Sequence, residues 1–128
     1  ILELDYIFIP INTENSHFVL GFIDLKHKVT YVFDSLGSNR PALSYQLYSL
    51  MQELLGMDEE RWRLTDWRWT TTNLGCVPIQ PNSCDCGLYV CLMTSVLAVN
   101  QGLHHIRRDA ANDYRLRMAH EILNNETR

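Results

Sequence analysis

A stretch in the second half of the chain, from Gly87 to Val99, is mostly apolar. As a helix it would present apolar side chains on every side, and such a helix is stable only where other elements bury it. The polar residues 82–85 predict its start, and the tripeptide Asn100-Gln101-Gly102 predicts its end. The chain must therefore surround this helix with other secondary structure, and Cys86 is expected at the helix N-terminus.

Short apolar runs rich in β-forming residues precede this helix. Three of them are expected to be adjacent strands: Asp5–Ile11, Phe18–Asp24 and Val29–Asp34. The polar residues 24–28 predict a hairpin between the last two. Residues 62–72 alternate loosely and are expected to be extended. Residues 76–80 form another apolar run, which Pro78 would confine to a sheet edge because proline cannot donate to a ladder.

Two amphipathic helices complete the predicted elements. Pro41 suits the first turn of a helix, and leucines together with Met51 follow at spacings of three and four until Gly56. A last helix is expected over residues 109–124. Strands, a helix, further strands and then helices, in this order, predict a single α+β domain over residues 1–128.

The composition is that of an ordinary globular domain, with 46% hydrophobic residues, 20% charged residues and a net charge of −4. A negatively charged chain has no general attraction to nucleic acid or to anionic membranes. No apolar run reaches the roughly 18 residues needed to span a bilayer. A domain of this size needs no disulfides, so we expect reduced thiols in an intracellular protein. The four cysteines are Cys76, Cys84, Cys86 and Cys91.

The position of Cys86 favours a reactive thiol. The free N–H groups and the partial positive charge at a helix N-terminus stabilise a thiolate, which is the nucleophilic form of cysteine. Gly87, the next residue, would leave room for a substrate backbone to approach. The alternative reading is that Cys86 is simply a small buried apolar residue.

A thiolate nucleophile needs a base, and the base needs an orienting group. His17 is the best placed histidine because a strand follows it and Asp34 ends the neighbouring strand, so a hairpin can bring the two together. By itself, Asp34 could equally be an ordinary turn residue. Of the remaining histidines, His27 lies in the predicted hairpin turn, His104 and His105 follow the apolar helix, and His120 lies within the last helix.

Metal binding is the competing site chemistry. The cysteines and histidines around the apolar helix lack the usual spacing of zinc ligands, and there is no second C-x-x-C pair. We therefore expect no metal and no other cofactor. Core packing is the expected role of Trp62, Trp67 and Trp69.

Four blocks of the sequence, in this order, resemble the ubiquitin-like-protein proteases, whose best-known members process and remove SUMO. Of these, residues 9–11 with 16–20 resemble the histidine block of that family, and residues 31–36 resemble its aspartate block. Residues 80–91, Gln-Pro-Asn-Ser-Cys-Asp-Cys-Gly-Leu-Tyr-Val-Cys, resemble its glutamine and cysteine block, and residues 117–122 resemble its closing helix. The spacings between the blocks fit as well.

The resemblance implies a papain-like α+β core of the Ulp type, with a small mixed sheet and a buried central helix. It implies that Cys86 is the nucleophile, His17 its general base and Asp34 the group that orients this base. Gln80 would donate its side-chain amide to the oxyanion hole. Cys84 is the rival nucleophile, at a position that varies in the family.

The resemblance also implies a substrate and its channel. The enzyme would cut after the C-terminal Gly of SUMO or another ubiquitin-like protein, including its conjugates, in the nucleus or cytoplasm. Substrate would contact Phe18, Asp85 and Gly87. The family usually has Trp at the position of Phe18.

Part of the family's protease domain lies upstream of the histidine block, whereas this chain starts 16 residues before His17 and without Met. We therefore expect a fragment that lacks the N-terminal part of the domain. Two alternatives remain open at this point. One is a non-catalytic module that binds ubiquitin-like proteins. The other is an acyltransferase using the same thiol, for which Arg107-Arg108 is the only candidate for a basic pocket.

Overall fold

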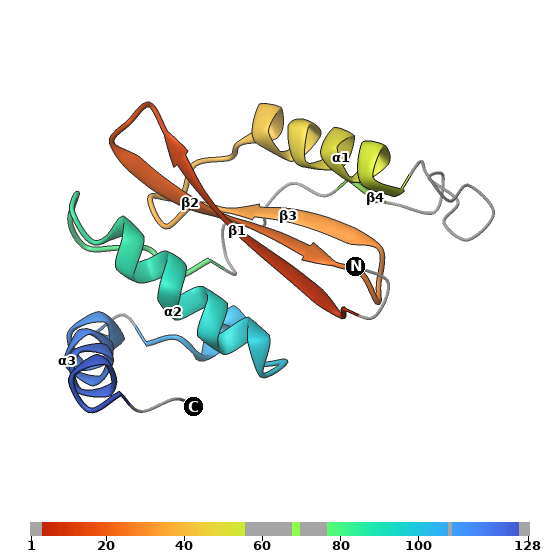
Figure 1. Ribbon diagram of the computed structural model, residues 1–128. Helices are drawn as coiled ribbons and strands as arrows, with labels where there is room; N and C mark the ends of the chain where they lie inside the picture. The colour runs from red at the N-terminus through yellow and green to blue at the C-terminus, as the bar shows by residue number, and fades with distance from the viewer. Residues whose placement is uncertain (1–3, 56–67, 70–76, 108, 126–128) are drawn as a thin grey trace.

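A four-stranded sheet with the order β1-β2-β3-β4 lies at the centre of the computed structural model (Figure 1). Described residues are 4–55, 68–69, 77–107 and 109–125. Successive antiparallel pairs join β1 (Tyr6–Thr13), β2 (His17–Asp24) and β3 (Val29–Phe33). The short strand β4 (Arg68–Trp69) pairs in parallel with β3. The predicted small mixed sheet and the hairpin are thus confirmed.

Helices cover both faces of this sheet. On one face lies α1 (Pro41–Leu55), and on the other lies α2 (Cys86–Ala98), with α3 (Ala110–Leu123) packed on the outer side of α2 (Figure 1). A short 3₁₀ helix, η3 (Leu103–His105), connects α2 with α3. The bounds of α1 and α3 agree with the predicted helices, and Asn100, with φ of 58°, follows the end of α2 as expected.

The central strand β2 is buried on both faces because it lies between α1 and α2. Its side chains alternate, with Val19 and Ile23 in the cluster under α1 and Leu20 and Phe22 in the cluster under α2. Met51 of α1 belongs to the first cluster. The second cluster contains three buried side chains of α2: Tyr89, Val90 and Met93. A strand covered twice explains why residues 18–24 read as a nearly continuous apolar run.

The expectation that α2 is buried on all sides is wrong for one of its faces. The face toward the sheet is buried, whereas Cys91 and Ala98 are exposed and Thr94 and Ser95 are half-buried. The sheet covers only one side of α2, and α3 covers only part of the other. The apolar composition of residues 87–99 therefore overstates how much of this helix is covered by the described residues.

The apolar run before α2 does not form the expected edge strand. Residues 77–80 have no regular structure, and Cys76 lies outside the described residues. Pro78 has no N–H, and the N–H of Gln80 donates to the carbonyl of Ser35 at 2.8 Å instead of to a ladder. Most of residues 62–72, including Trp62 and Trp67, likewise lie outside the described residues.

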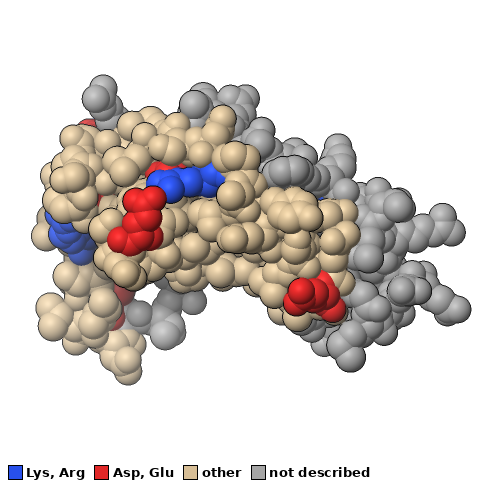
Figure 2. Space-filling model, turned by 90° about the horizontal axis from the view of Figure 1, so that it is seen from above, with Lys and Arg blue, Asp and Glu red and all other residues tan. Residues whose placement is uncertain are grey.

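The face seen from the α1 side carries few charged side chains among the described residues (Figure 2). The single charged residue of α1 itself is Glu53. Within the described ranges, no helix has both the length and the apolar character needed to cross a membrane.

Candidate active site

His17 is the first residue of β2, and a tight hairpin turn fixes its place. Glu14 and Asn15 in this turn have φ of 55° and 56°, the left-handed conformation that such turns require. Thr13 Oγ1 donates to the backbone carbonyl of His17 at 3.0 Å. The His17 residue is 8% exposed, so its ring is held in a nearly water-free position.

Asp34 follows the last residue of β3 and is 1% exposed. The register pairs Leu20 of β2 with Phe33 of β3, which brings the start of β2 and the end of β3 to the same edge of the sheet. There, Nε2 of His17 lies 2.7 Å from Oδ1 of Asp34. The expected contact of Asp34 with a ring nitrogen of His17 is therefore present. It leaves Nδ1 as the nitrogen that could exchange a proton with a nucleophile.

Two further donors hold the Asp34 carboxylate. The N–H of Leu36 donates to Oδ1 at 2.9 Å, and Nε of Arg40 donates to Oδ2 at 2.8 Å. Burial acts most strongly on this group and by itself raises the pKa of Asp34. The hydrogen bonds from His17, Leu36 and Arg40, together with the positive charge of a protonated His17, outweigh burial and hold the pKa below its ordinary value of 3.8. Asp34 therefore stays ionised beside His17.

Cys86 is the first residue of α2 and is 7% exposed. The first helical hydrogen bond runs from the N–H of Tyr89 to the carbonyl of Asp85 at 3.0 Å. The N–H groups of residues 86–88 therefore have no partner within the helix, and they lie at its positive end. Cys86 and the two other described cysteines, Cys84 and Cys91, are free thiols.

A network around Asn82 fixes the loop that leads into α2. Its Oδ1 accepts the N–H groups of Cys84 and Asp85, each at 3.0 Å, and its Nδ2 donates to Asp85 Oδ2 at 2.8 Å. Arg115 of α3 forms an ion pair with the other oxygen of Asp85. The hydrogen bond from Asn82 and the nearby Arg115 lower the pKa of Asp85 against the opposing effect of burial. The described contacts of Asp85 thus lie within the protein, and its expected role at the substrate remains a prediction.

Gln80 is 5% exposed and lies at the other end of this loop. Its Nε2 donates to the backbone carbonyl of Asn82 at 2.6 Å, and Ser35 Oγ donates to its Oε1 at 2.5 Å. Ser35 directly follows Asp34, the residue that pairs with His17. Gln80 is therefore hydrogen-bonded to the neighbour of Asp34 in the sequence.

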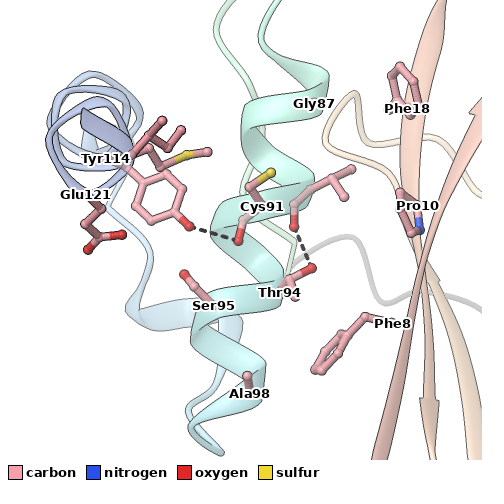
Figure 3. Close-up of a pocket in the computed structure, with 13 residues that line it drawn as sticks. Phe8, Pro10, Phe18, Gly87, Cys91, Thr94, Ser95, Ala98, Tyr114 and Glu121 are labelled. Atoms are coloured by element: carbon pink, nitrogen blue, oxygen red, sulfur yellow. Dashed lines mark hydrogen bonds between the residues drawn. The ribbon is translucent and has the colours of Figure 1, made fainter. Parts of the chain in front are cut away.

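A groove of about 710 Å³ runs between β1, α2 and α3. Phe18 and Gly87, the residues that follow His17 and Cys86, both line it and lie at the same end (Figure 3). Phe18 is 40% exposed, and a Cβ built on Gly87 would meet no atom within 4 Å. The residues expected to contact substrate at these two positions are therefore accessible from the groove. On the α3 side, the Tyr114 hydroxyl donates to the carbonyl of Cys91 at 3.3 Å.

The rival residues lie in other surroundings. Cys84 is exposed and precedes the helix, and its thiol lies 3.4 Å from Asn82 Oδ1. His27 pairs with Asp24 in the β2–β3 turn at 2.7 Å. Among the described residues, no group of three His, Cys, Asp or Glu side chains could hold a metal ion.

Sequence reasoning gave no role to Ser35, Arg40 and Arg115, and it used Asn82 only among the polar residues 82–85 that predict the helix start. A serine directly after the aspartate and an arginine just before Pro41 are local signals that could have been considered. Asp85 and Arg115, in contrast, are 30 residues apart, and no sequence pattern links them.

Comparison with known proteins places this chain in a family. The model of the Ulp1 protease family, C-terminal catalytic domain, matches residues 1–127. The ubiquitin-like-specific protease 1 of Saccharomyces cerevisiae is 37% identical over 121 residues, which are 94% of this chain and 19% of that protein. The chain therefore spans about a fifth of the length of this curated relative.

Solved structures of Ulp1 have the same fold. A SUMO protease Ulp1 whose catalytic cysteine is oxidised to a sulfonic acid matches with a TM-score of 0.82 and 34% identity, over 98% of this chain and 56% of that one. The C-terminal protease domain of Ulp1 in complex with Smt3, the yeast ortholog of SUMO, matches with a TM-score of 0.79 and 35% identity, over 94% of this chain and 53% of that one. These matches confirm the predicted α+β, papain-like core of the Ulp type. The chain belongs to the Ulp1 protease family, whose C-terminal catalytic domain it matches along nearly its whole length.

Proposed function

We propose that this protein is a thiol protease and isopeptidase that cleaves after the C-terminal Gly of SUMO or another ubiquitin-like protein. The observation that carries the proposal is the buried pair of His17 and Asp34, 2.7 Å apart, in a chain of the Ulp1 family whose free Cys86 begins a helix. A base with a fixed orienting carboxylate is what a thiol nucleophile requires.

In the proposed reaction, His17 takes the proton of the Cys86 thiol, and the resulting thiolate attacks the carbonyl carbon of the terminal Gly. His17 then gives a proton to the leaving amine as the C–N bond breaks, and a thioester with Cys86 remains. His17 next takes a proton from water, which attacks the thioester and releases the carboxylate product and the thiol. Asp34 keeps its negative charge throughout, and it stabilises the imidazolium form of His17.

Each attack places negative charge on the former carbonyl oxygen. Gln80 would supply one donor to this oxyanion, and the backbone N–H of Cys86 would supply a second. Donors that are fixed before the reaction are worth far more than donors that must be ordered during it. The low exposure of Gln80, at 5%, supports this role because water competes weakly there.

The substrate class rests on the relatives. One matched structure holds the Ulp1 protease domain in complex with Smt3, and the curated relative is named for ubiquitin-like proteins. A terminal glycine has no side chain, so its backbone could lie close to Gly87 and Phe18 at this end of the groove. The free thiols of the described cysteines, Cys84, Cys86 and Cys91, support an intracellular location. Within the cell, we propose the nucleus or the cytoplasm.

A covalent probe tests the function directly. SUMO with a C-terminal Gly-Gly vinyl or alkyne warhead should label this protein at Cys86, while the same warhead on ubiquitin should label it at least tenfold more slowly. Peptide mapping identifies the modified residue, and Cys86→Ser is the control. A protein that binds SUMO but is never labelled would be a binding module, and labelling by the ubiquitin probe alone would exclude the proposed substrate.

Gly87→Ala tests whether substrate passes over the start of α2. The added methyl group meets nothing in the protein, and alanine is the better helix former, so the free energy of unfolding should stay equal or rise by up to ~1 kcal/mol. The value of kcat/KM on a SUMO C-terminal fluorogenic substrate should fall by about 10–200-fold, the usual effect of one methyl group in a tight site. Unchanged turnover would show that substrate does not approach Gly87.

Arg40→Gln tests the support of Asp34. At neutral pH the free energy of unfolding should fall by about 1.5–3 kcal/mol, the usual worth of a hydrogen bond to a buried charge. The pKa of Asp34 in the folded protein lies below 3.8. The loss of unfolding free energy in Arg40→Gln should therefore be complete above pH 3.8, and it should disappear as the pH falls through the lower folded pKa. Urea unfolding across this pH range measures it.

Arg107→Gln is the matched control for this test. Arg107 pairs with Asp109 on the surface, where the two side chains are 78% and 70% exposed, and such pairs contribute about 0–1 kcal/mol. A loss in Arg40→Gln that is no larger than in Arg107→Gln would mean that Arg40 does not hold the Asp34 carboxylate.

A further inference from the structure

Ser35 binds Gln80 twice, although the two residues are 45 positions apart. Its backbone carbonyl accepts the N–H of Gln80 at 2.8 Å, and its Oγ lies 2.5 Å from Gln80 Oε1. Both residues are almost fully buried, with Ser35 at 1% exposure and Gln80 at 5%. The two bonds hold the main chain and the side chain of Gln80 independently.

Chemistry fixes the direction of these bonds. The third hydrogen bond of Gln80 runs from Nε2 to the backbone carbonyl of Asn82 at 2.6 Å, and a carbonyl oxygen can only accept. The nitrogen of the Gln80 amide must therefore face Asn82, which places Oε1 toward Ser35. Since an amide oxygen also only accepts, the Ser35 hydroxyl is the donor.

The amide plane of Gln80 is thus held at both of its ends. A glutamine amide has two N–H groups, and the carbonyl of Asn82 takes one of them. With Oε1 and one N–H fixed, the direction of the other N–H is set as well. That group is the one that can donate to an oxyanion.

We propose that Ser35 is a positioning residue for Gln80, and that its hydroxyl aims the Gln80 amide before the reaction begins. The inference rests on the proposed thiol protease function. It extends that function because two consecutive residues, Asp34 and Ser35, then serve different parts of the site. Asp34 orients the base, and Ser35 orients the oxyanion donor.

Ser35→Ala removes the hydroxyl and leaves the backbone bond to Gln80. On a SUMO C-terminal aminomethylcoumarin substrate, kcat should fall by about 10–100-fold with KM nearly unchanged, because only the transition state carries the oxyanion. Alkylation of Cys86 by iodoacetamide should keep its rate, since displacement of iodide forms no oxyanion. Ser44→Ala, which truncates a serine of 2% exposure on α1, is the control for loss of a buried hydroxyl and should leave kcat unchanged.

A double-mutant cycle separates positioning from a general loss of stability. Gln80→Ala should lower kcat by about 10²–10³-fold, and Ser35→Ala should add no further loss in that background. Independent losses that multiply would overturn the proposal, as would full activity in Ser35→Ala. If Ser35→Ala does not fold, Ser35→Thr and Ser35→Val, which are isosteric with each other, test the hydroxyl instead, and only Thr should retain activity.

The Gln80 side-chain amide can also be observed without turnover. In NMR spectra of the ¹⁵N-labelled protein, the Gln80 NH₂ group should show two well-separated proton signals protected from exchange. In Ser35→Ala these signals should move together and exchange at least tenfold faster, and unchanged signals would overturn the proposed positioning. A protein without turnover but with this NMR response would refute the protease function and leave the Ser35–Gln80 orientation standing.

Discussion

The buried carboxylate of Asp34 is the group on which the rest of the site depends. A charge with 1% exposure is stable only where hydrogen bonds replace its lost water. Three parts of the chain supply them: His17 at the start of β2, Leu36 in the turn after β3, and Arg40 directly before α1. Loss of any one donor would leave a buried oxygen underpaired, so the orientation of His17 and the stability of the fold are coupled through one side chain.

The sheet makes this arrangement possible because its central strand cannot shift. With β2 covered by α1 on one face and α2 on the other, a slip of one residue would exchange its two apolar faces and turn His17 away from Asp34. Ser35, Asn82 and Arg115 hold the segment from Gln80 to Cys86. Rigid elements thus position His17, the proposed base, and a hydrogen-bonded loop leads to Cys86, the proposed nucleophile.

Local patterns predicted the elements, and the order of four motif blocks predicted the site. Strand and helix bounds followed from apolar periodicity, and Asp34 was found because it ends the strand beside His17. The open face of α2 could not be predicted, since composition reports how apolar a helix is but not which neighbours cover it. Residues 77–80 were misread as a strand because their N–H and side-chain partners, such as Ser35, lie far away in sequence. For the same reason, no sequence pattern indicated the ion pair of Asp85 with Arg115.

The central claim is that the site makes a buried thiol the most reactive one, and cysteine alkylation tests this most directly. Cys84 and Cys91 are exposed while Cys86 is 7% exposed, so accessibility alone predicts that Cys86 reacts last of these three. Limited treatment with iodoacetamide at neutral pH, followed by mass-spectrometric mapping of all four cysteines, should instead label Cys86 first. In Asp34→Asn, the rate at Cys86 alone should fall. Faster labelling of Cys84 or Cys91 than of Cys86 in the unaltered protein would contradict the account.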